Sequence, residues 1–195
     1  MKHSLSMLAL AAAAACAPAL AQAQTGTIIK ATASGPAESP PNGSPGSSVA
    51  TFELDGNILR AEVPFRDLLG DTVAAHIHCC TTASFTGVAP VAVPFVDFPL
   101  GVKGGLYTHA FDLTDATIYD PAFLASYGGT PQGASSALID AINASTAYLN
   151  IHTDQYPQGE IRGFMVAAPI PEPATWGMLA MGMAGLGMMA RRRRA

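Results

Sequence analysis

Short segments of alternating apolar and polar residues, separated by turns rich in glycine and proline, constrain this chain more than any other feature. The clearest case is the turn Asp55-Gly56-Asn57, which stands between the alternating segments 49–54 and 58–63. An Asp-Gly pair in this position favours a hairpin, because glycine adopts the positive backbone φ angles that a tight turn needs. Successive side chains of a strand point to opposite faces, so each segment can bury one face in a common core. Many short segments of this kind predict an all-β fold, a Greek-key β-sandwich or barrel.

The segments expected to form strands are short and closely spaced. Their ranges are 27–34, 49–54, 58–63, 72–78, 91–93, 103–111, 148–153 and 160–166. Seven of their apolar side chains are predicted to be buried, on the basis of the alternation. These are Phe52, Ile58, Val63, Leu149, Ile151, Ile161 and Phe164.

Two short helices are expected in the longest connection between strands. Asp120 and Pro121 start the first helix, because aspartate caps the free N–H groups of a helix and proline suits its first position. The second helix is expected to start at Ser135 or Ser136 and to end near Asn143.

The first 23 residues have the pattern of a processing signal. The basic start Met1-Lys2-His3 precedes an apolar run, and small residues then offer cleavage sites within residues 19–23. This order is typical of a secretory signal peptide, so we expect residues 1–23 to be removed and the protein to be exported.

A second sorting pattern occupies residues 169–195. Pro171-Glu172-Pro173 precedes the uncharged run 174–190 and the arginine block 191–194. The uncharged run is marginal for a helix that crosses about 30 Å of hydrocarbon, and the arginines would stay on the cytoplasmic side. This order resembles the PEP-CTERM sorting signal of Gram-negative bacteria. The resemblance implies transient insertion into the inner membrane, processing by an exosortase, and delivery to the cell envelope or the outside.

The body between these signals, residues 24–168, has the size of one domain with one core. Residues 24–170 include five basic and thirteen acidic residues, a net charge of −8. The whole chain has a formal charge of only −4 because of the arginines of the tail. An acidic body without a basic cluster argues against nucleic acid and anionic membrane surfaces as partners.

Three histidines form the strongest candidate for a chemical site. His76 and His78 share one face of a predicted strand, roughly 7 Å apart at about 3.3 Å of rise per residue. His152 belongs to a second predicted strand, and the three imidazoles converge if these strands are neighbours. Such a set of nitrogen ligands suits copper or zinc. The alternative is structural, with inward imidazoles bonded to Thr153, Glu160 or backbone carbonyls inside the barrel.

Cys79 and Cys80 directly follow the histidine pair and are the only cysteines of the body. Adjacent cysteines cannot link distant parts of a fold. In an oxidising compartment three states are open to them: a vicinal disulfide, a role as additional soft ligands of the metal, or a bond to another chain. We expect no free thiols after secretion.

The histidine segments, together with a motif near the end of the body, resemble the chordin-type CHRD domain over roughly residues 27–166. The resemblance lies in Ala75-His76-Ile77-His78, Tyr148-Leu149-Asn150-Ile151-His152-Thr153 and Pro157-Gln158-Gly159-Glu160-Ile161-Arg162-Gly163. The family commonly has Gly-Pro where this chain has Cys79-Cys80. The resemblance implies an extracellular protein with an immunoglobulin-like or superoxide-dismutase-like β-barrel. The histidines also resemble three copper ligands of copper/zinc superoxide dismutase, whose bridging histidine and second metal cluster have no clear counterpart here.

Two functional hypotheses follow from these features. The first is a secreted or envelope-associated, non-enzymatic binding or structural module of the extracellular matrix, whose partner is a protein or a polysaccharide. The second is a mononuclear copper or zinc protein, extending to a superoxide-dismutase-like oxidoreductase, that uses His76, His78 and His152. Glu160 and Arg162 share a face and are expected to form a structural ion pair or to bind a loop carbonyl. No residue is assigned a catalytic role.

Overall fold

The computed structural model describes residues 26–168 and Gly182. The predicted signal peptide, the Pro171-Glu172-Pro173 motif and all of the predicted C-terminal helix except Gly182 lie outside the described residues. In the part of the chain that the structure describes, no helix has the length and apolar character needed to cross a membrane.

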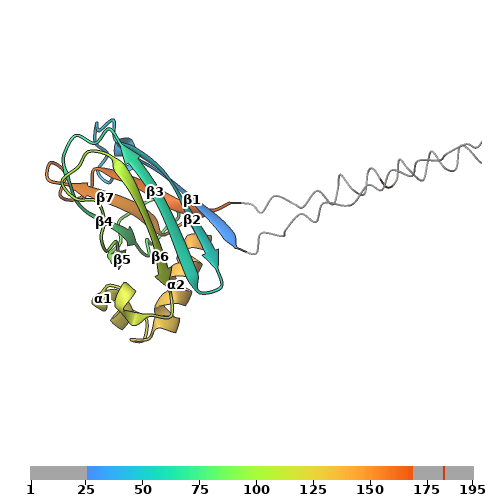
Figure 1. Ribbon diagram of the computed structural model, residues 1–195. Coiled ribbons are helices and arrows are strands. Elements are labelled where there is room, and N and C mark those ends of the chain that lie inside the picture. Colours follow the sequence, from blue (N-terminus) through green and yellow to red (C-terminus); the bar gives the residue numbers. More distant parts are fainter. Residues whose placement is uncertain (1–25, 169–181, 183–195) are drawn as a thin grey trace, which may run out of the picture.

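The body is mostly antiparallel β-structure, with two short α-helices in one connection (Figure 1). The strands are β1 Thr27–Ser34, β2 Ser47–Asp55, β3 Ile58–Arg66, β4 Thr72–His78, β5 Val91–Pro94, β6 Gly105–Asp112, β7 Tyr148–Thr153 and β8 Ile161–Ala167. The helices are α1 Pro121–Ser126 and α2 Pro131–Asn143, with short 3-10 turns at Gly35–Ala37 and Ala116–Ile118. The expected all-β fold with two short helices is therefore confirmed.

The eight strands form one curled sheet in the order β5-β4-β7-β8-β1-β2-β3-β6. Its edge strands, β5 and β6, meet through side chains: Phe95, just after β5, stacks on Tyr107 of β6 with ring centroids 4.8 Å apart. If this seam is counted as a contact, β4, β5 and β6 follow one another and β3 lies beside β6. That is the strand order of a Greek key.

The turn Asp55-Gly56-Asn57 joins β2 to β3, as the sequence predicts. Asp55 and Ile58 face each other as the last pair of the hairpin, and Gly56 has a φ of 56°. At this φ a residue with a Cβ is disfavoured, whereas glycine is not. The hairpin therefore fixes the register of β2 and β3, and its turn lies at the predicted residues.

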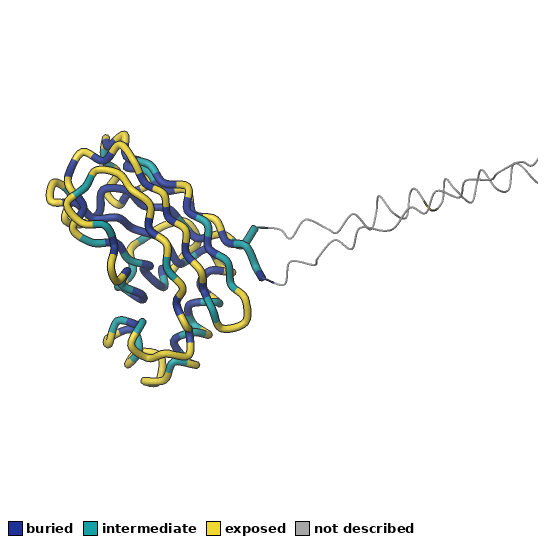
Figure 2. The backbone as a smooth tube through the Cα atoms, in the orientation of Figure 1, coloured by how far each residue is buried: buried dark blue, intermediate teal, exposed yellow. Residues whose placement is uncertain are grey.

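The core occupies the inside of the curled sheet (Figure 2). Five of the seven apolar residues expected there are fully buried, namely Phe52, Val63, Leu149, Ile151 and Ile161. Ile58 and Phe164 are only partly buried. Phe164 belongs to the outer face of β8, where Phe85 packs against its ring at 5.8 Å.

The sequence predicts the N-terminal cap of α1 correctly and that of α2 incorrectly. Asp120 caps α1 by accepting hydrogen bonds from the N–H groups of Ala122 and Phe123, as expected. The expected start of the second helix at Ser135 or Ser136 is wrong, because Thr130 caps α2 and Pro131 takes its first position. Proline is favoured there because a first-turn N–H has no intrahelical partner.

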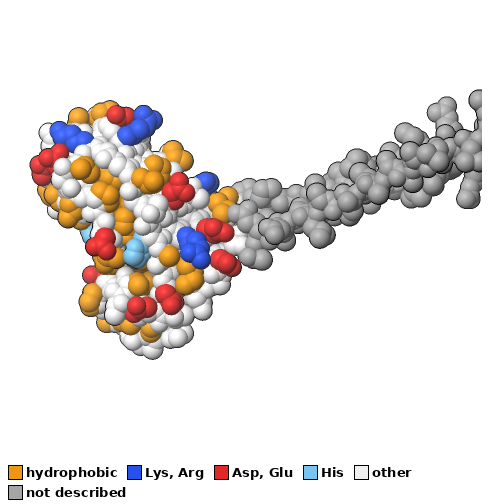
Figure 3. Space-filling model, in the orientation of Figure 1, with side chains coloured by type: hydrophobic (Ala, Val, Ile, Leu, Met, Phe, Trp, Pro, Cys, Tyr) orange, Lys and Arg blue, Asp and Glu red, His pale blue; other side chains and the backbone are white. Residues whose placement is uncertain are grey.

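The two ends of the body lie side by side, since the N–H of Ala168 donates to the carbonyl of Ile28 at 2.7 Å (Figure 1). On the face of the molecule drawn in Figure 3, acidic and basic side chains are scattered among apolar ones, and the basic ones form no single patch.

Candidate metal centre

Strands β4 and β7 bring the three histidines together on the outer face of the sheet. The strands are antiparallel neighbours, with Ala74 opposite His152 and His76 opposite Asn150. Ala75 and Ile77 point into the core, so the alternation turns His76 and His78 to the opposite face. The inward orientation assumed in the structural alternative is therefore wrong: the three side chains converge, but on the outer face of the sheet.

Two segments cover this outer site and explain why its residues are nevertheless buried. The covering loop, residues 79–90, lies over His78, and the turn at Pro157 lies beside His152. His78 and His152 are each 9% exposed, whereas His76 is partly exposed. Ligand exchange at the site would therefore proceed past His76.

Backbone carbonyls fix the proton of two of the imidazoles. Nδ1 of His78 lies 2.9 Å from the carbonyl oxygen of Ala89, and Nδ1 of His152 lies 3.1 Å from that of Pro157. A carbonyl oxygen only accepts, so Nδ1 of each ring carries the proton and donates. In the neutral rings the Nε2 atoms therefore present bare lone pairs.

These lone pairs are directed into the site. Nε2 of His152 lies 3.2 Å from Nδ1 of His76. Nε2 of His78 is buried and, among the described residues, has no hydrogen-bond partner. Buried polar atoms are nearly always paired, so this unpaired nitrogen beside two other imidazoles is free to bind a ligand.

The electrostatics of the site keep all three rings neutral at physiological pH. Burial, followed by the proximity of the other two histidines, lowers the pKa of His76 to about 4. Burial also lowers the pKa of His78 and of His152, although the carbonyl contacts oppose this effect. A neutral imidazole is the form that binds a metal ion.

The spacing of the nitrogens fits one metal ion. One nitrogen from each of the three histidines lies within 4.8 Å of the others. Two ligands with metal–nitrogen bonds of about 2.0–2.1 Å stand roughly 3.3 Å apart in tetrahedral geometry, close to the separation of the His76 and His152 nitrogens. Nitrogen-only ligand sets of this kind suit copper and zinc.

Tyr148 and Arg162 form a layer behind His78 that the sequence analysis did not identify. The ring of Tyr148 stacks on His78 at 4.9 Å, and its hydroxyl contacts both the N–H and the carbonyl of Ala89. The guanidinium of Arg162 lies 5.0 Å from the Tyr148 ring centre and donates to the carbonyl of Gly87. Strand alternation offered one signal for this layer, because Tyr148, Asn150 and His152 share a face.

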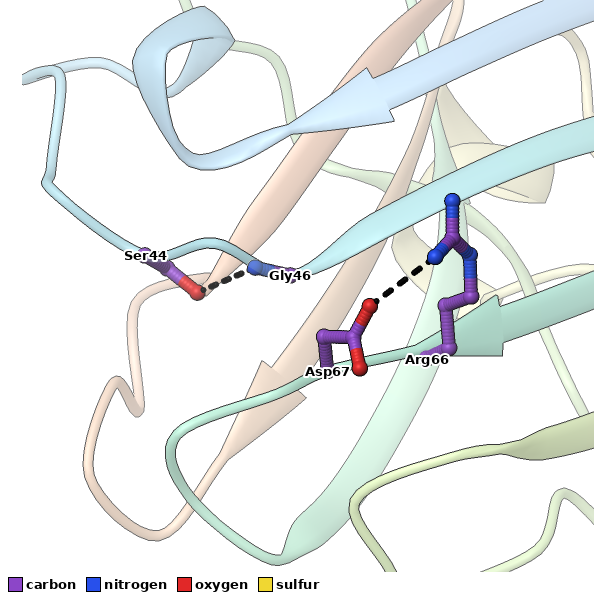
Figure 4. A network of polar contacts seen from close by, with 4 residues as sticks. All are labelled: Ser44, Gly46, Arg66 and Asp67. Carbon is purple, nitrogen blue, oxygen red and sulfur yellow. Dashed lines mark hydrogen bonds and ion pairs between the residues drawn. The ribbon is translucent and has the colours of Figure 1, made fainter.

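The expected ion pair between Glu160 and Arg162 is wrong. Arg162 instead donates to the carbonyls of Ala37 and Gly87, the loop-carbonyl alternative. The Glu160 carboxylate accepts from the hydroxyl of Ser44, which also accepts from the N–H of Gly46 (Figure 4). Glu160 precedes the first residue of β8, so the alternation within that strand does not apply to it. Among the described residues, one ion pair joins a lysine or arginine to a carboxylate, and it lies between Arg66 and Asp67.

The two cysteines lie at the edge of the site and are bonded to each other. Cys79 and Cys80 are joined in a vicinal disulfide, the first of the three states considered. The group of candidate ligands consists of the three histidines, within the residues described. A disulfide sulfur carries no thiolate charge, so the suggested soft ligation does not apply here.

Comparison with models of known families finds two matches. The CHRD domain model matches residues 29–165. The PEP-CTERM protein-sorting motif matches residues 169–194. A search of curated proteins and a search of solved structures each returned no match.

Proposed function

This chain belongs to the CHRD domain family, and from that fold we propose that its body is a metal-binding module, with one copper or zinc ion held by His76, His78 and His152. The PEP-CTERM motif implies processing by an exosortase and placement in the envelope or outside the cell. Within the proposal, the C-terminal segment is inserted transiently into the inner membrane before it is processed.

One observation supports this proposal above the others: the buried Nε2 of His78, which has no partner among the described residues. A purely structural histidine would use both ring nitrogens or expose one of them to water. His78 instead donates from Nδ1 to a carbonyl and keeps its Nε2 lone pair beside two other imidazoles. Metal-binding histidines have this arrangement, in which the second nitrogen is fixed by a carbonyl or carboxylate.

When bound, copper would supply one-electron chemistry, and zinc would supply a Lewis acid. The chain itself contributes positioning: Ala89 and Pro157 orient two rings through their carbonyls, and the covering loop excludes water from His78. We assign no catalytic residue, and the proposed role is to bind the ion.

Elemental analysis tests the proposal on protein purified after export. We expect about one equivalent of copper or zinc per chain, and its loss in the His76→Ala plus His152→Ala variant, because one imidazole cannot hold the ion. A metal-free and fully folded wild-type protein would contradict the proposal. That result would favour the other hypothesis, a non-enzymatic module that binds an extracellular protein or polysaccharide.

The pH dependence of metal affinity provides a second prediction. Protons compete with the metal only below the pKa of each ligand in the metal-free protein. Because the pKa of all three histidines is lowered, and that of His76 to about 4, affinity should begin to fall at a lower pH than it would for imidazoles with the usual pKa of 6.5, and it should drop toward pH 4. Competition with a chelator at each pH measures this curve. A steep decrease that already starts above pH 6.5 would contradict it.

A further inference from the structure

The Cys79–Cys80 disulfide forms the start of the covering loop, directly after the end of strand β4. Cys79 directly follows the ligand His78, and the loop ends at Pro90, directly before β5. The two ends of the loop are bonded together beside the site. The N–H of Cys79 donates to the carbonyl of Pro90 at 3.0 Å, next to the bond from His78 to Ala89. The disulfide therefore belongs to the same short unit that orients His78.

The two cysteines of this disulfide differ in exposure. Cys79 is 1% exposed and packs in the core, whereas Cys80 is partly exposed. Cys80 lines two shallow depressions between the disulfide and the helices α1 and α2. The hydroxyl of Tyr127, an exposed side chain that lines both depressions, lies 3.4 Å from the Cys80 sulfur. A thiolate from solution can thus reach Sγ of Cys80, and exposed disulfides are the ones that exchange.

We propose that Cys79–Cys80 is a thiol–disulfide exchange site for a dithiol, and that its redox state sets the metal affinity of the neighbouring histidine site. A thiolate of the dithiol attacks Sγ of Cys80, the Cys79–Cys80 bond breaks, and Cys79 leaves as a thiolate that takes up a proton. The second thiol of the dithiol then attacks the mixed disulfide and releases Cys80. The dithiol is oxidised to its disulfide, and the protein gains two thiols.

The coupling to the metal runs through the position of Ala89. The closed disulfide restricts the backbone of residues 79 and 80 at the start of the loop. The hydrogen bond from the Cys79 N–H to the carbonyl of Pro90 carries this restraint to the other end, where Ala89 presents its carbonyl to His78. Opening the disulfide frees this segment and weakens the bond that fixes the His78 tautomer. Loss of such an outer partner typically lowers metal affinity by about 10- to 100-fold. This part of the inference rests on the proposed metal-binding function.

The experiment compares the full chain before and after treatment with dithiothreitol and anaerobic removal of the reagent, which would itself bind zinc. Zn²⁺ is the probe because zinc is redox-inert. We expect alkylation and mass spectrometry to find two new thiols in the folded protein, and zinc affinity to fall by about 10- to 100-fold. A Cys79→Ala plus Cys80→Ala variant should bind zinc as weakly as the reduced protein and should not respond to dithiothreitol. This variant lacks thiols, so it separates loop release from ligation by sulfur.

Nitrogen NMR of His78 gives a readout that needs no metal. We expect the Nδ1–H tautomer to dominate in the oxidised protein and to lose its dominance on reduction. A disulfide that resists excess dithiothreitol, an unchanged zinc affinity, or tighter zinc binding after reduction would each overturn the inference. If neither the oxidised nor the reduced form binds zinc, the proposed metal-binding function fails. If the His78 tautomer is then also unchanged on reduction, the coupling between the disulfide and His78 is overturned as well.

Discussion

Zinc or copper ion at a thousand times its dissociation constant should raise the midpoint of thermal unfolding of the wild-type body by about 10 °C. Binding to the folded state alone contributes about 4 kcal/mol at this concentration, and a domain of this size gains roughly 2–4 °C per kcal/mol. In the His152→Gln variant we expect the shift to fall to about 2 °C or less, because glutamine removes the nitrogen that lies 3.2 Å from His76. Thermal unfolding followed by circular dichroism, with and without metal, measures both values.

His109→Gln is the matched control for this experiment. His109 lies on β6, at the far edge of the sheet from β7, and does not belong to the three-histidine group. Its variant should keep the full metal-dependent shift. Equal shifts in the wild-type and His152→Gln proteins would mean that the ion binds elsewhere, and the proposed site would have to be abandoned.

Local patterns in the sequence predict most of this fold because the determining rules act over a few residues. Strands 27–34, 72–78 and 148–153 appear with the predicted boundaries, since alternation and bounding turn residues are both local signals. The same alternation places His76 and His78 on one face. That His152 joins them depends on the pairing of β4 with β7, which the alternation within each strand does not predict.

The face of the sheet on which the site lies could not be predicted in this way. Strand β7 is buried along its whole length, so its hydrophobic pattern does not separate inside from outside. The outer face is buried because loops far away in sequence cover it: Ala37 and Gly87 both accept hydrogen bonds from Arg162. Backbone carbonyls carry no side-chain signature. The sequence therefore offered a carbonyl as a kind of partner for Arg162, His78 and His152, but it could not identify which carbonyl each one binds.

Glu160 illustrates the same limit and leads to the largest expected loss of stability. Its carboxylate is fully buried and accepts four hydrogen bonds from segments up to 116 residues away. The donors are the hydroxyls of Ser44 and Thr153 and the N–H groups of Leu69 and Gly70. A Cβ on Gly70 would lie 2.6 Å from the Thr153 hydroxyl, so glycine permits this close approach. One side chain thus joins three loops at one end of the barrel.

Glu160→Gln should lower the free energy of unfolding by about 3–5 kcal/mol at pH 7. Each carboxylate oxygen receives one backbone N–H, so either orientation of the glutamine amide turns an NH₂ group toward a backbone donor. A buried donor left unpaired costs about 1–3 kcal/mol, and the bonds that remain lose the benefit of the negative charge. Denaturant unfolding measures the loss, and Glu62→Gln, on the exposed side of β3, is the control and should change stability by less than about 0.5 kcal/mol.

The pH dependence of this difference distinguishes the carboxylate from a mere packing defect. Burial alone would raise the pKa of Glu160, but the four hydrogen bonds outweigh burial and hold the pKa below its usual value of 4.5. A folded-state pKa below that of the unfolded chain stabilises the protein above pH 4.5, and this contribution is lost as pH falls through the folded value. The gap between wild type and Glu160→Gln should therefore narrow below pH 4.5. A gap that stays constant down to pH 3 would mean that shape, and not charge, is what the buried side chain contributes.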